Sequence, residues 1–102
     1  IGSSLGAWIS AWASTRRRVA GLVLLAPPIR LPGHAEPLEW EAERVLLIHG
    51  WRDELIPAET VMAAAARRRA ALLLLDDDHR LHASLARIEI AVARILAECA
   101  VS

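Results

Sequence analysis

The sequence predicts an α/β fold, a three-layer αβα arrangement in which helices cover a parallel sheet of about three strands. Continuous apolar runs bounded by turn residues alternate with segments whose apolar residues recur every three or four positions. Such runs suit strands buried on both faces, and the recurring segments suit amphipathic helices. Connections of this length favour parallel pairing with right-handed crossovers. We expect residues 1–102 to belong to a single domain.

The first half of the chain predicts a helix, a strand and a long loop. Apolar residues between Leu5 and Ala13 recur at helical spacing, and this helix is expected to end near Arg16–Arg18. The apolar run Val19–Ala26, closed by two prolines, predicts a fully buried strand. The segment Pro27–Glu43 carries four prolines and one glycine without a clear period, so we expect a connecting loop, with at most a short helical turn, that is too short to form a lid domain.

The second half predicts two more strands and two more helices. Val45–His49 is a second buried strand, and a helix follows from Pro57, in its first turn, to about Arg69. Ala71–Leu75 is the third strand. The last helix presents one apolar stripe, formed by Leu85, Ile88, Val92, Ile95 and Leu96.

Composition excludes several classes of protein. Twelve basic and twelve acidic residues give no net charge, so neither nucleic acid nor an anionic membrane is an expected partner. The single cysteine, Cys99, favours a reducing compartment, and we predict a cytoplasmic protein. The longest apolar stretch is roughly half of a membrane-spanning helix. The chain opens at Ile1 on a motif that should follow a strand, so we interpret it as part of a longer protein.

That motif, Gly2-Ser3-Ser4-Leu5-Gly6, matches G-x-S-x-G. It is typical of a sharp strand-to-helix turn that exposes a serine hydroxyl, where side chains at Gly2 or Gly6 should collide with backbone. Ser4 is the candidate nucleophile, and the Leu5 amide at the helix N-terminus is a candidate oxyanion donor. The motif alone also fits a structural turn or helix cap. Its position before a helix and buried strands favours catalysis.

A candidate acid and base each follow a predicted strand. Asp53 lies past the second strand and His79 past the third, which gives the chain order Ser, Asp, His. A serine hydroxyl becomes a useful nucleophile when an imidazole takes its proton, and a carboxylate selects the tautomer of that imidazole. A plain capping role for Asp53 stays open.

Alternatives exist for both roles. His82 competes with His79 as the base, although His82 is expected to enter the last helix. Asp78, beside His79, could replace Asp53 as the acid. The two histidines also have the spacing of a metal pair, but no third ligand stands at a matching distance, so neither a metal nor a cofactor is predicted.

Two other residues lie in the same segment as the candidate acid. Trp51 lies two residues before Asp53, and it either lines a substrate pocket or has a plain packing role. His49 ends a buried strand, and we interpret it as a hydrogen-bonded structural histidine.

These motifs resemble the α/β-hydrolase superfamily, through GSSLGAW at the serine turn, VLLIHGWRDELIP around the acid and DDDHRL around the histidine. The resemblance is closest to small, cap-less bacterial esterases or thioesterases, since PPIRLPGHAEPLEWEAER stands where larger relatives insert a lid. It implies Ser4 as nucleophile, Asp53 as acid, His79 as base and Leu5 as one oxyanion-hole amide. It also implies that earlier strands, with the second oxyanion donor, precede Ile1, so this chain is the C-terminal part of the domain.

The predicted function is a serine hydrolase that cleaves a small ester or thioester through an acyl-Ser4 intermediate. The partner is then a small acyl substrate, and the sequence leaves the oligomeric state open. We do not expect full catalysis from these residues alone. The alternatives are a catalytically inactive hydrolase-like fragment or interaction domain and, within the hydrolases, a peptidase.

Overall fold

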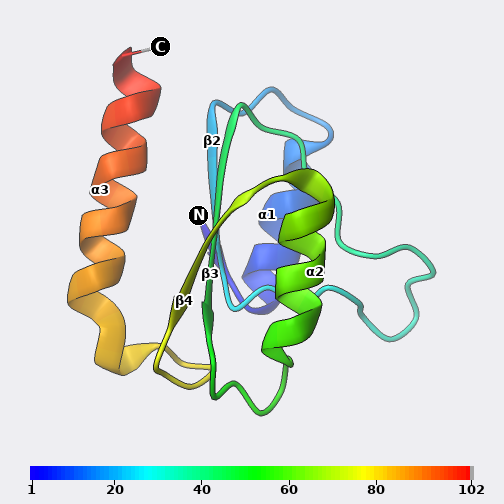
Figure 1. The fold of residues 1–102 in the computed structure, drawn as a ribbon. Coiled ribbons are helices and arrows are strands. Elements are labelled where there is room, and N and C mark those ends of the chain that lie inside the picture. The colour runs from blue at the N-terminus through cyan, green and yellow to red at the C-terminus, as the bar shows by residue number, and fades with distance from the viewer. Residues whose placement is uncertain (102) are drawn as a thin grey trace.

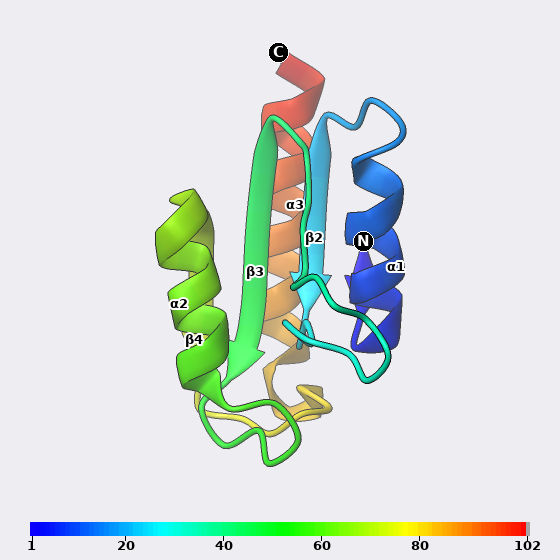
Figure 2. The ribbon, with the colours of Figure 1, turned by 90° about the vertical axis from the view of Figure 1, so that its right-hand side faces the viewer.

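A computed structural model describes residues 1–101 and contains one parallel sheet between two helical layers (Figure 1). Helices α1 and α2 cover one face and α3 covers the other, as the perpendicular view also shows (Figure 2). The elements follow in the order β1 (Gly2–Ser3), α1 (Leu5–Ser14), β2 (Gly21–Leu25), β3 (Arg44–Gly50), α2 (Ala58–Arg68), β4 (Ala71–Leu75), a 3-10 turn η1 (His82–Ser84) and α3 (Leu85–Val101). The predicted three-layer αβα architecture is confirmed.

The sheet has four strands in the order β1-β2-β3-β4, all parallel. The sequence predicted about three, and it missed β1 because two residues are too few to show any hydrophobic period. Gly2 and Ser3 nevertheless pair with Leu24 and Leu25 of β2. A strand segment therefore leads directly into the serine turn.

Alternation along the strands divides the core between the two faces of the sheet. Leu22 and Leu24 point to the layer of α1 and α2, whereas Val23 points to α3. Leu24 and Leu47, partners in the register of β2 and β3, are both fully buried. Because both faces are covered, these strands read as continuous apolar runs.

Two helices deviate from their predicted form. Helix α1 ends at Ser14, short of Arg16–Arg18, and the hydroxyl groups of Ser14 and Thr15 donate to carbonyls of the last turn. Such side-chain bonds compete with continuation of a helix. In α3, Ile88 and Ile95 are buried, but Leu85 and Leu96, predicted on the same stripe, are exposed.

The segment between β2 and β3 is a connecting loop, as predicted, and the short helical turn that the sequence allowed does not form there. Its Leu38 and Trp40 are buried with α1 and α2, so the loop completes that layer. Two hydrogen bonds hold it, one from the Glu41 amide to Ser14 Oγ at 2.9 Å and one from Arg68 to the Trp40 carbonyl at 2.6 Å. Within residues 1–101, no helix has the length and apolar character required to cross a bilayer.

Candidate active site

Ser4 occupies the turn between β1 and α1 in a conformation that non-glycine residues rarely adopt. Its φ is 54° and its ψ is −120°, and such a backbone persists only where its surroundings hold it. The Ser4 amide donates to the Leu25 carbonyl at 2.8 Å, and the Ser4 carbonyl accepts from the Ala7 amide at 2.9 Å. The turn is thus fixed between the sheet and the first helix.

The glycines of the motif contribute unequally to this turn. A Cβ at Gly2 would stand 2.2 Å from the Gly6 carbonyl oxygen and 2.5 Å from Ser10 Oγ, so the predicted collision is confirmed there. The same prediction is wrong for Gly6, where a Cβ would meet no described atom within 4 Å. Steric exclusion therefore acts at the first position of the motif.

His79 stands between Ser4 and Asp53. Its Nε2 lies 3.0 Å from Ser4 Oγ, and its Nδ1 lies 2.6 Å from Asp53 Oδ2. A carboxylate only accepts hydrogen bonds, so Nδ1 carries the proton and Nε2 is left to accept one from the Ser4 hydroxyl. The structure thus brings together three side chains that lie after three different strands of the sheet.

The carboxyl group of Asp53 is completely shielded from solvent. Its Oδ1 accepts the amides of Leu55 and Ile56, each at 2.8 Å. Burial is the largest influence on the pKa of Asp53 and raises it, but the hydrogen bonds from His79, Ile56 and Leu55 together outweigh burial and hold this pKa below its usual value. The buried acid is therefore kept ionised by its donors.

The loops that carry the acid and the histidine pack closely on each other. The Trp51 amide donates to the Leu75 carbonyl at 2.9 Å, and the Arg52 amide donates to the Asp77 carbonyl at 3.0 Å. A Cβ at Gly50 would stand 2.3 Å from that Asp77 carbonyl oxygen. Gly50 thus permits this approach, a role that its place at a strand end did not predict.

The alternative acid and base lie differently. His82 begins η1, and the contact with Ser4 Oγ is made by His79. Asp78 Oδ1 accepts the Arg80 amide at 3.0 Å, and the carboxylate that bonds His79 is that of Asp53.

Two further predicted site residues flank these three. Leu5 is the first residue of α1, where backbone amides have no partner within the helix. The side chain of Trp51 is about half exposed beside the acid loop.

His49 is the site neighbour whose importance the sequence did not reveal. It is fully buried, and its Nε2 lies 2.8 Å from the Ile56 carbonyl oxygen and 3.5 Å from Asp53 Oδ2. The prediction of a hydrogen-bonded buried histidine is confirmed, but its contact with the acid was not foreseen. In the sequence, the only indication of this contact was that His49 and Asp53 are four residues apart. That spacing brings the two side chains together only if the loop after β3 turns back on the strand.

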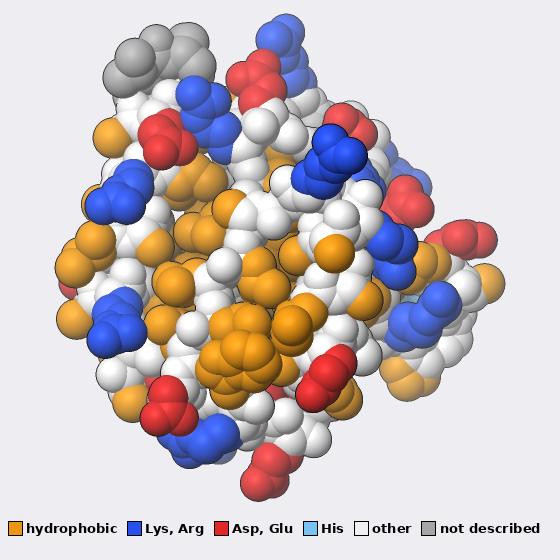
Figure 3. All heavy atoms as spheres, viewed as in Figure 1, with side chains coloured by type: hydrophobic (Ala, Val, Ile, Leu, Met, Phe, Trp, Pro, Cys, Tyr) orange, Lys and Arg blue, Asp and Glu red, His pale blue; other side chains and the backbone are white. Residues whose placement is uncertain are grey.

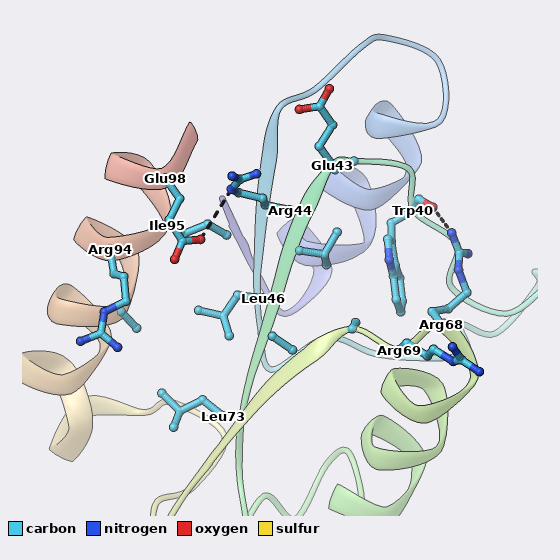
Figure 4. A pocket seen from close by; sticks show the side chains of 15 residues that line it. Trp40, Glu43, Arg44, Leu46, Arg68, Arg69, Leu73, Arg94, Ile95 and Glu98 are labelled. Carbon is cyan, nitrogen blue, oxygen red and sulfur yellow. Dashed lines mark hydrogen bonds and ion pairs between the residues drawn. The ribbon is translucent and has the colours of Figure 1, made fainter. Parts of the chain in front are cut away.

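A cavity of about 600 Å³ lies away from these residues, at the opposite ends of the strands (Figure 4). It opens between α2, α3 and the first residues of β3 and β4, and its described lining includes none of Ser4, Asp53 and His79. An ion pair between Arg44 and Glu98, at 3.6 Å, borders it. Apolar side chains gather on this face of the molecule (Figure 3). This cavity is therefore separate from the cluster formed by Ser4, Asp53 and His79.

A comparison with solved structures found a protein whose fold and sequence are both similar to those of this chain. The chain is similar to a proposed hydrolase of the α/β superfamily from Xanthomonas campestris pv. campestris, with a TM-score of 0.91 and 40% sequence identity. The match covers 95% of this chain and 56% of that protein, so the chain spans little more than half of its length. No family model and no curated protein matches the sequence.

Proposed function

We propose that this chain, which by fold and sequence belongs with the α/β-hydrolase superfamily, carries the nucleophile, base and acid of a serine hydrolase. The observation that supports the proposal most directly is the unbroken series of hydrogen bonds from Ser4 Oγ through His79 to Asp53. An exposed serine turn alone would fit a structural role. A serine hydroxyl bonded to an imidazole, itself bonded to a buried carboxylate, has the groups that acyl transfer requires.

In the first half-reaction, Ser4 Oγ attacks the carbonyl carbon of the substrate while His79 Nε2 takes the hydroxyl proton. Asp53 stabilises the imidazolium that forms, through the bond to Nδ1. Negative charge develops on the carbonyl oxygen, and the Leu5 amide is placed to donate to it at the helix N-terminus. Collapse of the tetrahedral intermediate breaks the bond to the alcohol or thiol, which leaves with the proton from His79, and acyl-Ser4 remains.

The second half-reaction releases the acyl group. A water molecule attacks the acyl-Ser4 carbonyl carbon and gives its proton to His79 Nε2. The bond to Ser4 Oγ then breaks, Oγ recovers the proton, and the carboxylic acid departs. Each proton taken by His79 is returned, so the chain is unchanged after a complete cycle.

For the substrate we propose a small ester or thioester. The support is the plain loop between β2 and β3, which forms no helical lid over the catalytic ends of the strands. Trp51, half exposed beside the acid loop, is the proposed apolar contact for it.

The test is covalent labelling of the full-length natural protein with a fluorophosphonate probe, followed by mass spectrometry of the labelled peptide. We expect the probe to label Ser4 and to leave Ser4→Ala unlabelled. Ser3→Ala is the matched control, because Ser3 is the exposed residue next to Ser4, and this variant should still be labelled. Hydrolysis of short-chain nitrophenyl esters should follow the same pattern. Wild-type protein that takes no label and cleaves no ester would contradict the proposal and favour a non-catalytic interaction role.

A further inference from the structure

A second imidazole lies close to the proposed catalytic acid, near the same carboxylate oxygen that His79 contacts. His49, near the end of β3, is fully buried, as is the Asp53 carboxyl group. Its Nε2 faces two acceptors, the Ile56 carbonyl oxygen at 2.8 Å and Asp53 Oδ2 at 3.5 Å. Ser4 Oγ contacts His79, so His49 has no part in the proton transfers described above.

The hydrogen bond to Ile56 defines the tautomer of His49. A carbonyl oxygen only accepts, so Nε2 must carry the proton that it shares with Ile56. Nδ1 of the same ring is buried and has no hydrogen-bond partner among the described residues. The ring is therefore assigned as the Nε2–H tautomer, with its N–H directed at the Ile56 carbonyl and Asp53 Oδ2 nearby at 3.5 Å.

Ile56 links this bond to the acid a second time. The Ile56 amide donates to Asp53 Oδ1 at 2.8 Å, while the Ile56 carbonyl accepts from His49. His49 is therefore connected to Asp53 Oδ1 through the Ile56 peptide, and its Nε2 also stands 3.5 Å from Asp53 Oδ2. The loop that carries Asp53 is anchored to β3 by this imidazole.

We propose that His49 is a positioning residue for catalysis, which holds Asp53 Oδ2 in line with His79 Nδ1. This inference rests on the proposed serine-hydrolase function and extends it. Without the Nε2–H of His49, the Ile56 carbonyl loses its donor and the acid loop is free to shift. The short bond between Asp53 and His79 then lengthens, and His79 is less well oriented toward Ser4.

The experiment compares three variants of the full-length natural protein. His49→Gln places an amide N–H near the position of Nε2, His49→Asn carries the same group on a side chain too short to reach Ile56, and His49→Leu has no donor. The measured quantity is the rate of Ser4 labelling by a fluorophosphonate, together with kcat and KM for a nitrophenyl ester. Leu47→Val, which removes volume from another fully buried side chain of β3, is the control for destabilisation alone.

We expect His49→Leu and His49→Asn to label about tenfold to a hundredfold more slowly than wild type, the loss expected when a catalytic group is misplaced by up to about 1 Å. The loss should fall on kcat with KM retained, because His49 does not touch the substrate. His49→Gln should recover most of the rate, and Leu47→Val should keep it. A second readout is the far-downfield NMR resonance of the proton between His79 Nδ1 and Asp53 Oδ2, which should shift in His49→Asn and return toward its wild-type position in His49→Gln.

Two results overturn the proposal: His49→Asn labelling at the wild-type rate, or His49→Gln reacting as slowly as His49→Asn. If His49→Leu fails to fold, the two polar variants still decide the question. Failure of the proposed function is distinguishable, since wild-type protein would then take no label on Ser4. In that case the NMR resonance alone reports whether His49 positions Asp53.

Discussion

The two ends of the sheet use charge in different ways. At the carboxyl ends of the strands, Asp53 is shielded from solvent and bonded at 2.6 to 2.8 Å by His79, Leu55 and Ile56. At the opposite ends, Arg44 and Glu98 are partly exposed and stand 3.6 Å apart beside the large cavity. The Asp53 carboxylate at the first end is desolvated and held by three donors, whereas the Arg44–Glu98 pair at the second end remains in contact with water.

The two ends are thus distinguished by the burial of their charged groups, and the cavity lies at the end where those groups are partly exposed. A cavity between partly exposed side chains removes few polar groups from water, so it reduces stability little and does not by itself indicate a functional site. Burial of a carboxylate reduces the stability of the folded state unless hydrogen-bond donors satisfy its oxygens. A buried, fully bonded carboxylate therefore indicates a candidate functional site. The proposed catalytic end is thus recognised by buried polar groups. Four predictions test this contrast.

The largest effect is expected from the base. His79→Ala removes the group that takes the Ser4 proton, so kcat for a nitrophenyl ester should fall by about 10⁴-fold or more. His82→Ala is the matched control and should keep nearly all of the activity, since His79 makes the contact with Ser4. The measurement is steady-state hydrolysis by the full-length natural protein. A greater loss of activity in His82→Ala than in His79→Ala would contradict the proposal that His79 is the base.

Replacement of the acid should have a similar or smaller effect. In Asp53→Asn the amide at this position no longer fixes the Nδ1–H tautomer, and kcat should fall by about 10⁴-fold. Asp78→Asn alters an exposed carboxylate that accepts the Arg80 amide, and it should leave kcat nearly unchanged. Equal losses in the two variants would remove the distinction between the buried acid and the exposed one.

Acid should destabilise the folded chain through Asp53 and Asp77, whose carboxyl pKa values are both lowered. The pKa of Asp53 is lowered in the folded chain, and that of Asp77 is lowered chiefly by a hydrogen bond from Ser84. The stabilisation from a lowered carboxyl pKa is complete above the unfolded value, near 4, and is lost as pH falls through the folded value. The free energy of unfolding, measured by urea titration, should therefore decline below about pH 5, and less steeply in Asp53→Asn. Parallel curves for wild type and Asp53→Asn would contradict this linkage.

The smallest effect is expected at the opposite end of the sheet. Arg44→Ala breaks the partly exposed pair with Glu98 and should cost at most about 1 kcal/mol of unfolding free energy. Ester hydrolysis and Ser4 labelling should not change. Urea denaturation and the labelling assay measure the two quantities on the same sample. A large loss of labelling in Arg44→Ala would show that the two ends of the sheet are coupled.

The sequence by itself determined the layered fold and the candidate residues. Apolar runs buried on both faces give β2, β3 and β4, and the serine, acid and histidine follow strand ends in a recognisable order. These features are local or periodic, so they can be read along the chain. The two-residue strand β1 escaped for the same reason, because it has no period and exists through its pairing with Leu24 and Leu25.

Only the tertiary structure decided which polar groups meet. The preference for His79 over His82 and for Asp53 over Asp78 could be argued from position, but the contacts depend on how two loops pack across Gly50. The contact of His49 with Asp53 arises because the acid loop turns back over the end of β3 and brings the Ile56 carbonyl to the imidazole. Side-chain hydrogen bonds depend on distances of a few tenths of an ångström between segments remote in sequence, and no local pattern encodes such distances.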